Sequence, residues 1–92
     1  MVTGHTPITI TLNSTTVPAV DQWFGYSLYE LASTDIVPVV FKDGTSTGQI
    51  LWAISHSSAG WTEGEVFPFP IEVPSGVLHI DTTGNPVGVV YV

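Results

Sequence analysis

The stretch Ile8-Thr9-Ile10-Thr11-Leu12 alternates apolar and hydroxyl side chains without interruption. Successive residues of a β-strand point to opposite faces, so Ile8, Ile10 and Leu12 share one face and the two threonines share the other. β-Branched side chains also pack well on a pleated surface. The stretch therefore predicts a strand that buries one of its faces.

Further segments share this strand chemistry, because they are rich in Val, Ile and Thr and are bounded by turn residues such as Asp43-Gly44. They are Gly25 to Ala32, Ile36 to Lys42, Gln49 to His56, Glu65 to Val73, Val77 to Asp81 and Val87 to Val92. Short strands at this spacing predict an all-β, single-domain antiparallel β-sandwich of about seven to eight strands. Jelly-roll and immunoglobulin-like strand orders both stay open. We expect one domain over residues 1–92, with residues 1–7 as an extended N-terminal arm.

The segment 21–31 has a helical alternative. Trp23, Phe24, Leu28 and Leu31 fall near the spacing of one helix face. A short helix here is the one rival to the all-strand pattern.

Several predicted strands are apolar on both sides. In the segment 49–56, Ile50, Trp52 and Ile54 face one way, and Leu51 and Ala53 face the other. A two-layer sandwich buries only one face of each sheet, so the second face must meet another segment or another subunit. The C-terminal run 87–92 is equally apolar and is expected to be an internal or an intersubunit strand.

The segment Phe67-Pro68-Phe69-Pro70 contains two prolines, which donate no backbone hydrogen bond. It cannot lie in the middle of a sheet. We expect an edge strand, or a strap laid on another surface.

The composition predicts a partner. The chain is 43% hydrophobic and 10% charged, whereas an ordinary soluble chain is about 25% charged. Charged side chains are therefore too few to cover the surface, and large apolar patches usually mark contact sites. We expect a homo-oligomer, a trimer being one option, or docking on another protein.

The charge excludes polyanionic partners. The net charge is −7, and Lys42 is the single cation, whereas binding to phosphates requires cations that displace counterions. Nucleic acid and anionic membrane surfaces are therefore not expected as partners. Cysteine is absent, so disulfides and thiolate metal sites are excluded. The first residues lack the features of a secretory leader, and we expect a product made in the cytosol.

The stretch Phe41 to Gln49, with sequence FKDGTSTGQ, raises the question of a phosphate-binding loop. Such a loop places Lys and Ser or Thr directly after the glycines and opens a helix. Here Lys42 precedes the glycines, and Gly48 is followed by Gln49 and an apolar run. The order indicates a connection between two strands, with Asp43-Gly44 at the turn.

Metal-ligating and catalytic residue types do not cluster. His5, His56 and His79 lie on separate segments, whereas zinc needs three or four converging ligands. The 43–47 loop and Glu63-Gly64-Glu65 offer few oxygens for calcium, so both are interpreted as solvated turns. We predict no catalytic residue, cofactor or metal, and an enzyme is the least favoured class.

Aromatic side chains supply the interface candidates, because they present large rigid areas with a polar handle. Trp61 follows Gly60 in a predicted loop and is expected to be exposed or interfacial. Lys42 is a candidate for a salt bridge across a subunit contact, and Lys42→Ala is expected to perturb assembly more than folding. The full set of interface candidates is Trp61, Phe67, Phe69, Lys42 and Tyr91.

The strand ending in Lys42-Asp43-Gly44, followed by small residues, Gly48 and the apolar strand 50–54, resembles small all-β structural proteins of tailed bacteriophages. The segment 69–81, the Gly84 turn and the last Val-rich strand extend the resemblance over residues 24–92. It implies a virion component, either a capsid decoration or cement protein or a tail or fibre module, commonly oligomeric and bound to proteins such as the major capsid protein. It implies no catalytic residue. The near absence of basic residues departs from the family pattern and leaves the docking surface unidentified.

We therefore expect a phage capsid decoration or cement protein, made in the host cytoplasm and located in the virion. The alternative is a tail- or fibre-associated β-sandwich module that binds carbohydrate or a receptor through Trp61 and neighbouring acidic groups.

Overall fold

The computed structural model describes residues 6–10, 16–30, 37–56, 62–82 and 86–92. Within these ranges the chain forms eight strands and no helix. They are β1 (Pro7–Ile10), β2 (Thr16–Pro18), β3 (Gln22–Glu30), β4 (Val37–Asp43), β5 (Ile50–His56), β6 (Thr62–Glu72), β7 (Val77–Thr82) and β8 (Pro86–Tyr91). None of these segments is a helix of the length and apolarity needed to cross a membrane.

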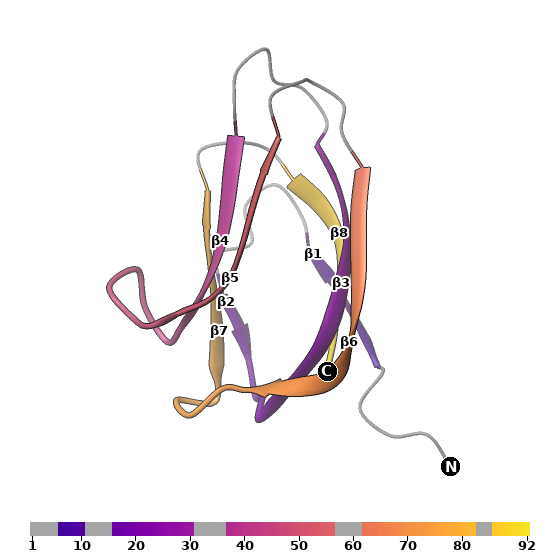
Figure 1. The fold of residues 1–92 in the computed structure, drawn as a ribbon. Coiled ribbons are helices and arrows are strands. Elements are labelled where there is room, and N and C mark those ends of the chain that lie inside the picture. The colour runs from indigo at the N-terminus through magenta and orange to yellow at the C-terminus, as the bar shows by residue number, and fades with distance from the viewer. Residues whose placement is uncertain (1–5, 11–15, 31–36, 57–61, 83–85) are drawn as a thin grey trace.

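The strands form two four-stranded sheets, which face each other in Figure 1. Sheet A has the order β1-β8-β3-β6, and sheet B has the order β2-β7-β4-β5. Every described strand pair is antiparallel. The all-β antiparallel sandwich expected from the sequence is confirmed.

The strands pair from the two ends of the described chain inward, the first with the last and the second with the seventh. β1 pairs with β8, β2 with β7, β3 with β6 and β4 with β5. The chain is therefore one long hairpin wound across two sheets, which is the strand order of a jelly roll and differs from the immunoglobulin order. The backbones of Thr6 and Val92 exchange two hydrogen bonds, of 3.0 and 2.9 Å, so residues 6 and 7 belong to this ladder. Residues 1–5 of the expected N-terminal arm lie outside the described residues.

Aromatic rings fill the space between the sheets. The ring of Trp23, which is fully buried, lies 4.5 Å from that of Phe41 in the opposite sheet and 4.9 Å from that of Phe67. Ile10 is also buried, and Ile8 packs against the core, as the alternating pattern predicts. Leu12 lies outside the described residues. Cohesion therefore comes mainly from apolar burial and from the backbone ladders.

The helical alternative for the segment 21–31 was wrong for the described residues, because residues 22–30 form β3, which pairs with β6 on one side and with β8 on the other. Leu31 lies outside the described residues. The register shifts between Trp23 and Gly25, which marks a β-bulge. The bulge changes the alternation, so that Trp23, Tyr26 and Leu28 all point into the core. Of the residues that suggested a helix face, Trp23 and Leu28 are buried and Phe24 is half-buried on an extended backbone.

Two strands, β8 and β6, test other expectations. β8 lies inside sheet A between β1 and β3, so the C-terminal run is an internal strand, as predicted. β6 is an edge strand, which confirms the interpretation of its two prolines. The turn expected at Glu63-Gly64-Glu65 was wrong, because these residues lie within β6 and pair with Leu28, Ser27 and Tyr26 of β3.

The stretch 41–49 connects β4 to β5, as its residue order indicates. Gly44 has a φ of +84°, which only glycine adopts readily. The backbone N–H of Asp43 donates to the carbonyl of Gln49 at 2.9 Å and closes the loop. The loop is also fixed to the turn between β6 and β7, since Asp43 Oδ1 accepts a hydrogen bond from the N–H of Ser75. It is a strand connection, and the element that follows it is strand β5 and not a helix.

Candidate functional site

The two phenylalanines of β6 have opposite environments. Trp23 pairs with Ile71 and Gly25 pairs with Val66, so residues 67–70 lie opposite Phe24 alone. In this bulge the Phe67 ring turns inward, 4.8 Å from the Trp52 ring, and its side chain is only 7% exposed. Phe69 points outward and is 81% exposed. Phe67 therefore belongs to the core of this chain and not to its surface, whereas Phe69 is accessible for contact.

A buried hydrogen bond lies next to the bulge. Trp23 Nε1 donates to the carbonyl oxygen of Gly25 at 2.7 Å, so both buried groups are satisfied. A Cβ atom at Gly25 would lie 2.2 Å from the carbonyl oxygen of Glu65. Glycine is therefore required for the close approach of β3 and β6 at this point.

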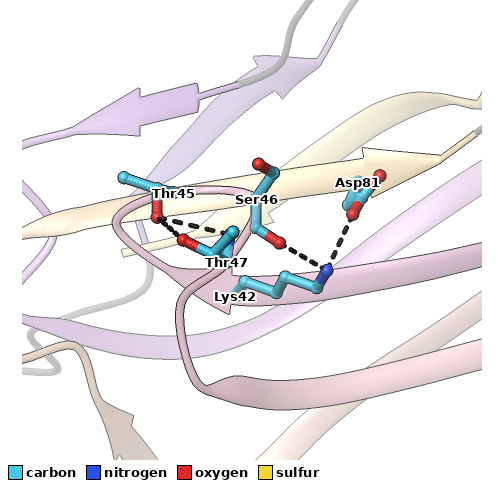
Figure 2. Close-up of polar contacts among 5 residues, drawn as sticks. All are labelled: Lys42, Thr45, Ser46, Thr47 and Asp81. Carbon is cyan, nitrogen blue, oxygen red and sulfur yellow. Dashed lines mark hydrogen bonds and ion pairs between the residues drawn. The ribbon is translucent and has the colours of Figure 1, made fainter.

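Lys42 forms its contacts within the chain. Figure 2 shows Lys42 Nζ between the backbone oxygen of Ser46, at 2.7 Å, and Asp81 Oδ2, at 2.8 Å. The Lys42 side chain is 17% exposed. The hydrogen bond and the charge of Lys42 hold the pKa of Asp81 below its ordinary value. Lys42 thus ties the 43–49 loop to sheet B, and a salt bridge to another subunit stays a prediction.

A hydrogen-bonded chain closes the side of the sandwich between edge strands β5 and β6. Tyr26 Oη donates to Glu63 Oε2 at 2.5 Å and accepts from Trp52 Nε1 at 3.0 Å. Burial, followed by the hydrogen bond to the Glu63 carboxylate, raises the pKa of Tyr26 above its ordinary value. The phenol stays protonated, and the arrangement joins β3, β5 and β6 as a structural bridge.

A shallow, open hollow of about 500 Å³ lies beside the bulge, lined by Ala19, Asp21, Gln22, Phe24, Glu72 and Val92. Gln22 Nε2 donates to Glu72 Oε1 at 3.0 Å, which orients an amide and a carboxylate on its wall. An aromatic ring with nearby amide and carboxylate groups suits a ligand rich in hydroxyls. Among the described residues no group of three His, Cys, Asp or Glu could hold a metal ion.

The outer surface of sheet A has an unusual composition. In the register, rows of paired residues alternate between inward and outward positions, with Val90 and Tyr26 on the inward side. From Gly25 to Tyr29 of β3 the outward rows carry no charged residue, whereas the outward Gln22–Glu72 row beyond the bulge carries one. We call the uncharged surface the neutral face; it consists of Pro7, Thr9, Gly25, Ser27, Tyr29, Thr62, Gly64, Val66, Val87, Val89 and Tyr91.

The structure distributes the sequence-predicted interface residues over the molecule. Tyr91 is half-buried within the neutral face, Phe69 lies in the β6 bulge, and Lys42 is on the other sheet. Trp61 lies outside the described residues. The neutral face itself was not predicted, because its residues come from four strands whose order the sequence pattern does not reveal.

No family model matches the chain, and neither a curated protein nor a solved structure matches it.

Proposed function

We propose that this protein is a virion structural protein of a tailed bacteriophage, acting as a capsid decoration or cement protein through protein–protein contacts. The neutral face is the observation that carries the proposal, because an uncharged, partly apolar sheet surface on a chain of net charge −7 favours contact with protein. The resemblance of residues 24–92 to small phage structural proteins supports it.

The fold is compatible with this role without defining it. Jelly rolls occur in viral capsid domains and also in lectins, and a fold alone does not establish a function. On this proposal the partners are copies of the same chain and other virion proteins such as the major capsid protein. The acidic surface disfavours contact with the packaged genome.

The test is reconstitution. The gene's neighbours identify the phage, and capsids of that phage assembled without this protein are mixed with the purified protein and sedimented. We expect saturable co-sedimentation with capsids and a higher temperature of capsid disruption. Isolated tails serve as the matched control. Absence of binding to both capsids and tails would contradict the proposal, and binding to tails alone would replace the capsid role with a tail role.

The hollow beside the bulge favours a second candidate, a carbohydrate- or receptor-binding module on a tail or fibre. A glycan array tests it, followed by titration of each glycan found while tryptophan fluorescence is recorded. Phe24→Ala and Trp61→Ala separate the two locations for such a site. Loss of binding with Phe24→Ala alone would assign it to the hollow, and no glycan binding would remove this candidate.

A further inference from the structure

We propose that the neutral face is the surface through which two copies of this chain pair, sheet A against sheet A, about a two-fold axis. The biological role of this pair rests on the proposed function, since a decorating protein acts through such contacts. The pairing itself is inferred from the charge, the shape and the area of the neutral face.

Charge restricts where two copies can meet. The chain carries eight acidic residues and one cation, so most surfaces of two copies repel each other. On β6, Glu63 and Glu65 occupy inward rows at the sheet edge, opposite Leu28 and Tyr26, and Glu72 lies beyond the bulge. On sheet B, Lys42 and Asp81 lie among the outward positions of the central strands. The neutral face is therefore the described sheet surface with the lowest electrostatic cost of self-contact.

The shape of the face complements itself. β8 presents a ridge of Val87, Val89 and Tyr91. The neighbouring strand β3 presents the small residues Gly25 and Ser27 beside it, and Gly64 of β6 pairs with Ser27 on the far side of β3. We call these three residues the trough. A two-fold axis between ridge and trough places the ridge of each copy over the trough of the other, which is the reciprocal contact that an isologous dimer requires.

The rim of this contact is apolar. Tyr29 is 42% exposed and Val66 is 61% exposed, at opposite ends of the trough. Both side chains would lose contact with water in the pair. Apolar surface removed from water is worth roughly 25 cal/mol per Å² before the cost of association is subtracted.

The area predicts the strength of the pair. With strands about 4.8 Å apart and about 3.4 Å per residue, the outward rows cover roughly 400 Å². A standard stable interface buries about 800 Å² per partner. We therefore expect reversible pairing, with a dissociation constant on the order of 10 μM to 1 mM. Most copies would then be paired only on a particle surface, where their local concentration is high.

Sedimentation of the full chain from about 20 μM to about 1 mM tests the proposal. We expect a concentration-dependent shift from monomer to dimer. Ser27→Glu places a carboxylate in the trough and is expected to raise the dissociation constant at least tenfold. The matched control is Ala53→Glu, which places the same charge at an exposed position on β5 of sheet B and is expected to leave pairing unchanged.

Circular dichroism and thermal melting verify that both variants remain folded; if Ser27→Glu does not fold, Val89→Thr takes its place and is expected to weaken pairing. A wild-type chain that stays monomeric at the highest concentration would overturn the proposal. Equal effects of the two glutamates, or a trimer in place of a dimer, would also overturn it. Pairing without capsid binding would contradict the proposed function and leave this inference intact.

Discussion

At the scale of single residues, one hydroxyl connects three strands. The hydroxyl of Tyr26 joins a core aromatic residue of β3 to the edge strands of both sheets through Trp52 and Glu63. The Tyr26 side chain is almost fully buried, and Glu63 and Trp52 are partly exposed. The hydroxyl therefore links β5 to β6 beside the contact between the Phe67 and Trp52 rings.

Tyr26→Phe tests this contribution. The variant keeps the ring and removes the oxygen, which leaves Trp52 Nε1 and the Glu63 carboxylate without this partner. We expect the free energy of unfolding to fall by about 1–3 kcal/mol. Urea denaturation followed by tryptophan fluorescence measures the change. Tyr29→Phe is the control, because the exposed Tyr29 hydroxyl faces solvent on the neutral face; an equal loss in both variants would show that the network adds nothing.

The Lys42–Asp81 pair predicts a dependence of stability on pH. The pKa of Asp81 is lower in the folded chain than in the unfolded one, so the unfolded state binds the proton more readily. The stabilisation is therefore present above the ordinary Asp pKa and is lost as the pH falls through the lower, folded value.

Asp81→Asn removes this charge and keeps an acceptor oxygen. We expect its melting temperature to lie below that of the wild type at neutral pH, with a difference that disappears at strongly acidic pH. Thermal unfolding between about pH 7 and about pH 2 measures it. A difference that persists unchanged at the acidic limit would show that the charge of Asp81 does not contribute.

At the scale of the element, β6 combines two functions in one bulged edge strand. Two prolines within four residues break its pairing to β3, and the chain gains a ring in the core and a ring at the surface. Prolines and a bulge also protect an edge strand from uncontrolled pairing with other chains.

Phe67→Ala and Phe69→Ala separate these functions. Phe67→Ala empties a site among three aromatic rings, and we expect the free energy of unfolding to fall by about 3–5 kcal/mol. Phe69→Ala changes an exposed position, and we expect a change within about 0.5 kcal/mol. Chemical denaturation of both variants measures the contrast. A large loss in Phe69→Ala would mean that its ring is covered in the folded chain.

The elements differ in how well the sequence predicts them. The sequence predicted correctly the strands that show regular alternation or lie between glycine and proline turns. Both signals are local, so they can be recognised without knowing which strands pair. β2 was missed, since three residues are too few to show a period. The bulge between β3 and β6 could not be predicted, because the four residues 67–70 lie opposite Phe24 alone and interrupt the regular pairing. Residues of the neutral face were visible in the sequence, but their assembly into one surface depends on long-range register.

At the scale of the whole molecule, the jelly roll separates two kinds of surface. The neutral face of sheet A is uncharged, whereas sheet B carries the Lys42–Asp81 pair and an anchored loop. The hollow with its carboxylates lies beside the β3–β6 bulge. The neutral face and the hollow support different functions, which is why capsid binding, self-association and glycan binding are tested on different residues.

The central position of β8 in sheet A also determines when the protein can fold during synthesis. In the described chain β1 is paired only with β8, and β3 needs β8 on one side. A ribosome makes residues 86–91 after the other described strands, so sheet A lacks a middle strand until these residues leave the exit tunnel. We therefore expect the inward apolar residues of β1 and β3 to stay uncovered until β8 is made, which is the interval in which the nascent chain is most exposed to aggregation.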